Sequence, residues 1–120
     1  IEGVEGQEQI LAHVVQSGVP VMGHLGLTPQ SIHQFGGFKV QGTGQGAAEW
    51  LLGQAKRAEA AGCFSIVLEA VPSDVARFVT EGISVPTIGI GAGSDTSGQV
   101  LVFQDLLGLN LDFQPRFVRK

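Results

Sequence analysis

Residues 65–72 read SIVLEAVP, and the rest of the sequence is most easily interpreted outward from this stretch. Four residues of strand-like character, 65–68, lead straight into Glu69, and Pro72 follows three positions later. An apolar run of this length between turn residues is typical of a buried strand in a parallel sheet. Because α/β folds place their chemistry at the carboxyl ends of such strands, we expect Glu69 to act as a general base. The alternative is a structural glutamate that caps a helix or forms an ion pair.

Helical periodicity and glycine punctuation divide the remaining sequence into regular elements. Helices are predicted over 7–16, 45–61 and 73–81, the last with Ser73 as its N-cap and Gly82 as its end. Strands are predicted at 1–3, 19–23, 64–68, 86–91 and 99–103, and a long loop over 24–44. This alternation indicates an α/β fold with a parallel sheet and right-handed crossovers.

The length of the chain limits how such a sheet can be completed. At 120 residues the sequence is too short for a (β/α)8 barrel, which typically needs about 250. Half a barrel would leave two strand edges bare. The sequence is 43% hydrophobic and only 15% charged, so we expect some apolar surface to meet another chain or further sequence. Together with a start at Ile1 rather than Met, this favours a fragment.

Composition argues against several classes of partner. A net charge of −4 gives no electrostatic reason to expect nucleic acid or an anionic membrane. Cys63 is the only cysteine, so neither an intramolecular disulfide nor a thiolate metal cluster is expected. A single cysteine fits a reducing compartment, and we expect a cytoplasmic protein. No histidine or glutamate spacing is typical of zinc, so any metal would be a hard ion with oxygen ligands.

Two glycine-rich stretches allow alternative functions. Residues 42–47 read GTGQGA, which matches G-x-G-x-x-A ahead of a helix, and Glu69 follows at the distance of a ribose-binding acid. The segment before it is short and polar for a central strand, so dinucleotide binding is kept as an alternative to a plain turn. Residues 89–93, GIGAG, would either cradle an anion or allow close packing. His24 is expected just after a strand, where it would hold a substrate oxygen, whereas His13 and His33 are expected at the surface.

Four motifs, in order, carry a family resemblance over nearly all of the chain. They are PVMGHLGLTPQS at 20–31, FGGFKVQG at 35–42, VLEAVP at 67–72 and PTIGIGAG at 86–93. The sequence thereby resembles the second half of ketopantoate hydroxymethyltransferase. The resemblance implies a (β/α)8 TIM barrel of the phosphoenolpyruvate mutase-like type. Residues 1–120 would supply strands 4–8 as a single domain, and the assembly would be a homo-oligomer, usually a decamer.

The resemblance also implies the chemistry. The family transfers a hydroxymethyl group from 5,10-methylenetetrahydrofolate to 3-methyl-2-oxobutanoate, giving 2-dehydropantoate for pantothenate and coenzyme A synthesis. Mg²⁺ chelates the oxo acid and stabilises its enolate. Glu69 matches the catalytic base, His24 matches a histidine that contacts the oxo acid, and Glu2 matches a glutamate held near the metal through water.

Part of the family's site has no counterpart in these 120 residues. The two aspartates that ligate Mg²⁺ and a substrate-binding lysine precede Ile1. If the 120 residues were the whole molecule, we would expect no catalysis. The alternatives are another Mg²⁺-dependent oxo-acid lyase or mutase of the superfamily, or a non-catalytic half-barrel.

Overall fold

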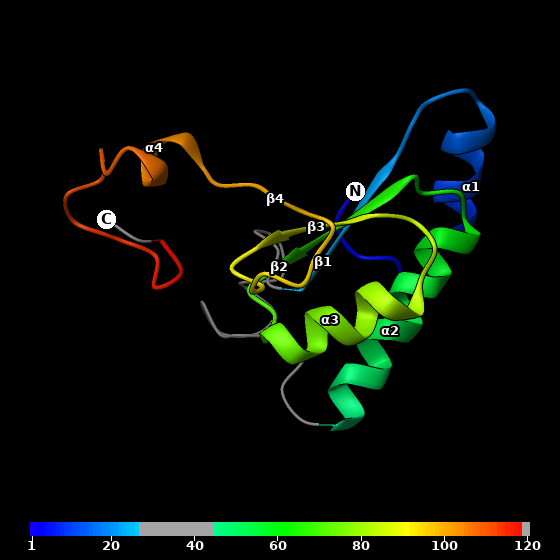
Figure 1. The fold of residues 1–120 in the computed structure, drawn as a ribbon. Helices are drawn as coiled ribbons and strands as arrows, with labels where there is room; N and C mark the ends of the chain where they lie inside the picture. Colours follow the sequence, from blue (N-terminus) through cyan, green and yellow to red (C-terminus); the bar gives the residue numbers. More distant parts are fainter. Residues whose placement is uncertain (27–44, 119–120) are drawn as a thin grey trace.

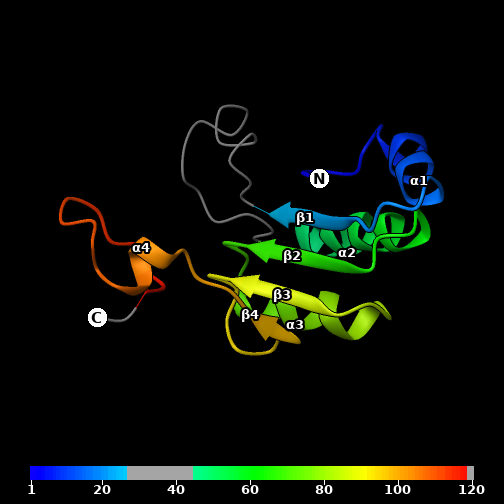
Figure 2. The same cartoon turned by 90° about the horizontal axis from the view of Figure 1, so that it is seen from above.

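The computed structural model describes residues 1–26 and 45–118, in which four strands form one parallel sheet. The strands lie in the order β1-β2-β3-β4, each parallel to its neighbour. Their bounds are β1 Met22–Gly26, β2 Ser65–Glu69, β3 Thr87–Ile90 and β4 Gly98–Gln99. Figure 2 shows the first three pointing the same way. The predicted parallel α/β fold is therefore confirmed.

The helices are α1 (Glu8–Gln16), α2 (Gln45–Ala60), α3 (Ser73–Gly82) and the short α4 (Phe103–Leu106). Helices α2 and α3 lie side by side against one face of the sheet, and α1 lies by the strands' amino ends (Figures 1 and 2). On α3 the buried residues Val75, Ala76 and Val79 recur at helical spacing, which is why this face turns inward. Trp50, on the outer side of α2, is 54% exposed.

The hydrophobic core fills the space between the sheet and these helices. Residues along β1, β2 and β3 alternate between buried and half-exposed, as expected when only one face is covered. The core includes three strand residues and three small or branched residues of α2: Leu25, Ile66, Leu68, Leu51, Ala55 and Ala58. The two alanines are fully buried and so allow α2 to approach the sheet closely. The opposite face carries the half-exposed side chains, among them His24, Val67 and Glu69.

Several predicted boundaries were wrong. β1 begins three residues later than predicted and runs on to Gly26, because parallel pairing with β2 continues through the glycines. β4 is only two residues long, and α4 begins at Phe103 where strand was predicted. Ser73 is the first residue of α3 rather than its cap, since Pro72 holds the N-cap position without a side-chain hydrogen bond. Most of the predicted long loop lies outside the described residues.

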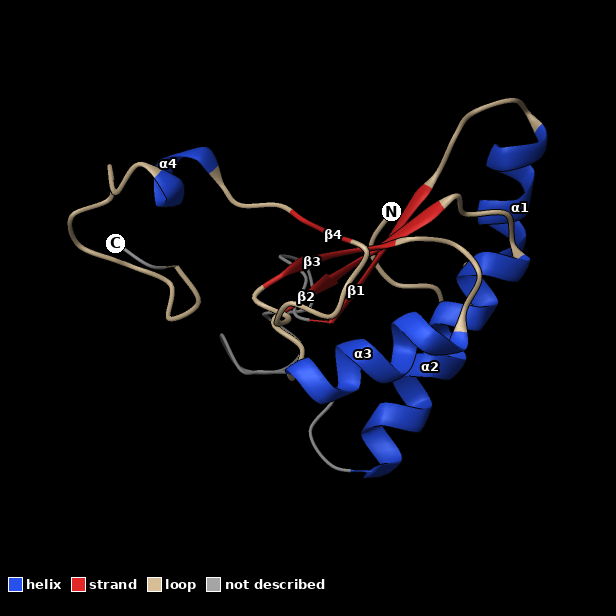
Figure 3. Ribbon diagram, viewed as in Figure 1, coloured by secondary structure: helices blue, strands red, loops and turns tan. Residues whose placement is uncertain are grey.

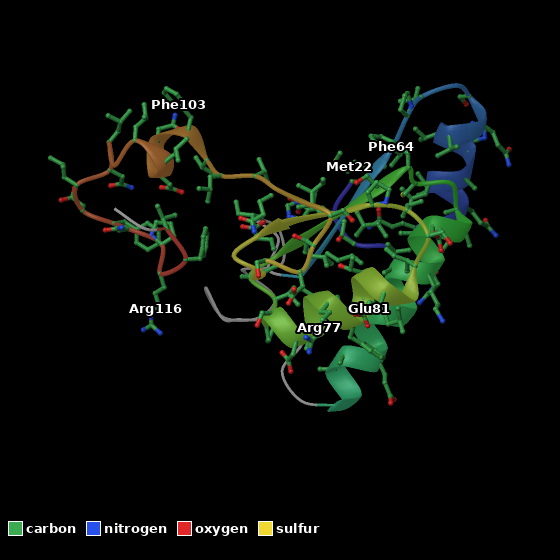
Figure 4. All side chains as sticks on the ribbon, in the orientation of Figure 1. Met22, Phe64, Arg77, Glu81, Phe103 and Arg116 are labelled. Atoms are coloured by element: carbon green, nitrogen blue, oxygen red, sulfur yellow. The ribbon has the colours of Figure 1, made fainter. Side chains whose placement is uncertain are left out.

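The C-terminal arm, residues 100–118, extends beyond the carboxyl ends of the strands (Figures 1 and 3). Phe103 and Arg116 lie on it, away from Met22 and Phe64 near the amino ends (Figure 4). Most of its large apolar side chains are exposed, with Leu111 at 94%. The arm surrounds a hollow of about 430 Å³ lined by its own residues. It therefore adds little to the core.

Candidate active site at the carboxyl edge of the sheet

The side chains of His24 and Glu69 form a hydrogen-bonded pair. His24 lies in the middle of β1 and Glu69 is the last residue of β2, and the register pairs His24 with Val67 and Gly26 with Glu69. Both side chains therefore stand on the sheet face that α2 and α3 leave uncovered. His24 Nε2 lies 2.8 Å from Glu69 Oε2, and about a quarter of each side chain is exposed (24% and 26%). The sheet thus brings a titratable base and acid together in a partly desolvated place.

The predicted position of Glu69 fits this arrangement, although the strand reaches one residue further than expected. The alternative in which Glu69 caps a helix finds no support, because α3 has Pro72 at its N-cap and no side-chain cap. The alternative in which Glu69 forms an ion pair is partly supported. Its partner is His24, which is charged only when protonated. Glu69 is therefore bonded to a proton-exchanging group rather than to a permanent cation.

His24 was expected one residue after a strand, and this placement was wrong. It is the third residue of β1, between the segment at residues 1–3, to which its backbone is hydrogen-bonded, and β2, where its register partner is Val67. His24 N donates to the carbonyl of Ile1 at 2.9 Å, and its own carbonyl accepts from Gly3 N at 3.0 Å. The side chain is thus carried by a paired strand, which fixes its direction toward Glu69. His13 is exposed, as predicted, and His33 lies outside the described residues.

Glu2 extends the sheet on the other side of β1. It forms an isolated parallel bridge with His24, so the register places Glu2 and His24 on the same face. The three predicted site residues, Glu2, His24 and Glu69, are therefore brought to one face on three successive segments. Within the described ranges, no group of three or more His, Cys, Asp or Glu side chains is arranged to hold a metal ion. Glu2 offers a carboxylate, the ligand type that suits a hard cation.

The two glycine-rich stretches have different outcomes. Residues 42–44 of the proposed dinucleotide motif lie outside the described residues, and the rest of it begins α2. In the turn after β3, packing accounts for the glycines. A Cβ at Gly91 would lie 2.6 Å from the Phe117 ring, and one at Gly93 would lie 2.4 Å from the Cβ of Ser73. Of the two interpretations of residues 89–93, close packing is therefore supported.

Sequence reasoning missed two residues beside Glu69. Ala70 has φ 51°, the left-handed conformation, and nothing in the sequence marks it, since alanine favours right-handed backbone. Gly26 has φ 95°. A glycine two residues after His24 is a sequence signal for such a conformation, but Gly26 fell in the stretch 24–44 that was predicted as a loop. Both residues contribute to the backbone that holds Glu69.

Cys63 is buried just before β2 and forms no disulfide. Burial raises the pKa of its thiol above the ordinary value of 9.0.

The helices that the structure describes are all too short or too polar to cross a bilayer.

The parallel sheet carries an acid–base pair formed by His24, in the middle of β1, and Glu69, at the carboxyl end of β2. It defines an α/β protein with the type of site that enzymes carry at this edge. A sequence profile described as ketopantoate hydroxymethyltransferase matches residues 1–120, and the chain belongs to that family. It is 59% identical over 120 residues to 3-methyl-2-oxobutanoate hydroxymethyltransferase of Francisella tularensis subsp. tularensis, covering 100% of this chain and 46% of the relative. It is 56% identical over 121 residues to the protein of that name from Legionella pneumophila, again covering 46% of the relative. The chain thus spans about half the length of these curated relatives.

Proposed function

We propose that residues 1–120 form the C-terminal half of an enzyme that transfers a hydroxymethyl group from 5,10-methylenetetrahydrofolate to 3-methyl-2-oxobutanoate, giving 2-dehydropantoate. The names of the relatives support transfer of a hydroxymethyl group to 3-methyl-2-oxobutanoate. The observation that carries the assignment is the Glu69–His24 pair at the carboxyl edge. In this proposal the segment around Glu2 and strands β1 to β4 are strands 4–8 of a phosphoenolpyruvate mutase-like (β/α)8 barrel.

Glu69 is the general base in this proposal. It removes the proton from C3 of the oxo acid, the C–H electron pair forms the C2–C3 double bond, and the carbonyl pair moves to the keto oxygen. Water cleaves the two C–N bonds of the methylene bridge of the donor, which releases tetrahydrofolate and leaves the one-carbon unit as formaldehyde. C3 then attacks the formaldehyde carbon, its carbonyl pair moves to its oxygen, and protonation of that oxygen gives the hydroxymethyl group. His24 Nε2 engages Oε2 of Glu69, which orients the carboxylate and leaves Oε1 as the oxygen that we assign to proton transfer. We also assign to His24 a contact with the bound oxo acid, because it is hydrogen-bonded to the proposed base.

This chain supplies one potential ligand for a magnesium ion, and its chemistry fits that ion. Glu2 is a carboxylate on the face that carries His24 and Glu69, and Mg²⁺ prefers oxygen ligands with several waters retained. We propose that Glu2 holds such an ion through water, with direct ligands from the preceding half of the protein. When bound, the ion supplies Lewis acidity to the keto group.

The test is exchange of the C3 hydrogen of 3-methyl-2-oxobutanoate with deuterium, followed by NMR on the full-length protein with Mg²⁺ and without folate. We expect Glu69→Gln to slow exchange by roughly 10²- to 10⁴-fold, the usual contribution of a general base. The matched control is Glu81→Gln, at an exposed position on α3 in the helix layer (Figure 4), which should exchange at the wild-type rate. Undiminished exchange by Glu69→Gln would remove Glu69 as the base.

The folate donor is tested separately from the base. With 3-methyl-2-oxobutanoate and Mg²⁺ present, 2-dehydropantoate should form only when 5,10-methylenetetrahydrofolate is added. Exchange without any folate-dependent product would instead favour another oxo-acid enzyme of the superfamily.

We also propose a cytoplasmic homo-oligomer, of the decameric type that the family resemblance implies. The exposed apolar side chains of the C-terminal arm support association. Light scattering on the full-length protein at micromolar concentration measures the oligomer, and a monomer would contradict this part of the proposal.

A further inference from the structure

Ala70 directly follows Glu69 and has a backbone conformation usually left to glycine. Its φ is 51°, and among residues 1–26 and 45–118 it is the only non-glycine residue with positive φ. The Cβ of an L-residue disfavours this region because it crowds the backbone carbonyl. Such strain persists only where the surrounding structure over-determines it, and it gathers at functional sites.

The turn at Ala70 changes which face the next side chain occupies. In a continued strand, Glu69 and residue 71 would share a face, because side chains alternate with a period of two. Instead Val71 is 2% exposed and belongs to the core cluster. Ala70 N still donates to the carbonyl of Ile90 at 2.9 Å, so the chain leaves the sheet only after this bond. Glu69 is thereby the last β2 side chain on its face.

Gly26 holds the same turn from the side of β1. It is the register partner of Glu69, and its φ is 95°. A Cβ at Gly26 would lie 2.2 Å from the carbonyl oxygen of Glu69 and 2.9 Å from Cγ2 of Val71. The end of β1 therefore lies directly against the backbone of Glu69, at a separation that only glycine permits.

We propose that Ala70 and Gly26 are positioning residues for Glu69. The left-handed turn at Ala70, held against Gly26, directs the carboxylate toward His24 and keeps the following side chain out of the site. The inference rests on the proposed function, because positioning matters catalytically only if Glu69 is the base.

The test measures C3 hydrogen exchange by the full-length protein with substitutions at position 70. A β-branched residue is poorly tolerated in left-handed backbone, so Ala70→Val should lower the turnover rate of exchange at least tenfold while changing KM less than threefold. Glycine adopts this conformation without strain, so Ala70→Gly should exchange at least five times faster than Ala70→Val. Equal rates for Ala70→Val and wild type, or equal slow rates for the two variants, would overturn the inference.

A left-handed turn far from the site provides the control. Gly62, at the end of α2, has φ 104°, and a Cβ there would lie 2.8 Å from Cγ1 of Val15. Gly62→Ala should lower stability but leave the exchange rate unchanged. A loss of exchange in this control as large as that in Ala70→Val would mean that general destabilisation explains both.

Two further comparisons keep the outcomes distinct. If Ala70→Val does not fold, Ala70→Asn takes its place, because asparagine accepts left-handed backbone. Folded Ala70→Asn should exchange within threefold of Ala70→Gly, and a rate lower than that would overturn the inference. If Glu69→Gln exchanges normally, the proposed function fails. If Glu69→Gln is inactive and Ala70→Val is fully active, only the positioning role fails.

Discussion

His24 and Glu69 meet through Nε2 and Oε2 at 2.8 Å although 45 residues separate them in the sequence. Replacing His24 by Phe keeps an aromatic ring and removes the donor to the carboxylate. A hydrogen bond of this type is worth about 1–2 kcal/mol, so we expect C3 hydrogen exchange to fall about tenfold. The control is His13→Phe at an exposed position of α1, where no change is expected. Wild-type exchange in His24→Phe would show that the pair does not assist Glu69.

The two glycines of β1, Gly23 and Gly26, should differ in how much stability is lost when each is replaced by alanine. A Cβ at Gly23 would make ordinary contacts, 3.5 Å from the Cβ of Ala58 and 3.7 Å from the Sγ of Cys63. Gly23→Ala should therefore change the free energy of unfolding by no more than about 1 kcal/mol, with stabilisation expected. Gly26→Ala combines left-handed strain with a Cβ only 2.2 Å from the carbonyl oxygen of Glu69 and should cost about 2–4 kcal/mol. Urea denaturation of both variants measures the difference, and similar values for the two would contradict it.

Glu59 connects the end of α2 to the segment that leads into β3. Its Oε1 accepts hydrogen bonds from the backbone N–H groups of Ser84 at 2.7 Å and Val85 at 3.0 Å. Glu59→Ala leaves both donors to water, and the expected loss of stability is about 1–2 kcal/mol. Glu49→Ala, at an exposed position on the same helix, should stay within about 0.5 kcal/mol of wild type. Thermal unfolding of both variants tests this, and equal effects would contradict it.

The buried thiol of Cys63 predicts a pH effect on stability. Its pKa is raised in the folded state by burial, so the folded protein holds this proton more tightly than the unfolded chain does. The resulting stabilisation is fully present below the ordinary thiol pKa of 9.0 and is lost as pH rises through the raised value. The stability of wild type relative to Cys63→Ala should therefore be constant near pH 7 and decrease above about pH 9. Urea titrations at several pH values measure this difference, and a constant difference to pH 10.5 would contradict it.

The sequence predicts the order of elements well, because helix and strand periodicities differ and glycines mark the ends. Helix α2 was placed to within one residue, and Gly62 follows it in left-handed conformation. In α1, Leu11 is buried but its apolar neighbour Ile10 is 61% exposed, since only one side of this short helix meets the core. Element ends were less predictable where pairing with a neighbouring strand, rather than local sequence, extended β1.

For the candidate site, sequence indicated Glu69, His24 and Glu2 but not how they meet. The apolar run ahead of Glu69 and the family motifs identified the residues. His24 comes within reach of Glu69 because β1 pairs with β2 in a register that sets His24 opposite Val67. Which strands pair, and in which register, has no local sequence signal. The left-handed backbone of Ala70 is likewise imposed by the burial of Val71 and the closeness of Gly26.

Trp50 gives the molecule an intrinsic fluorescence reporter in a known location. Among residues 1–120 it is the only tryptophan and there is no tyrosine, and the residue is 54% exposed on the outer side of α2. Emission excited at 295 nm therefore originates from one point in the helix layer, on the other side of the sheet from Glu69. Within residues 1–120, quenching by iodide therefore measures how a binding partner covers that layer.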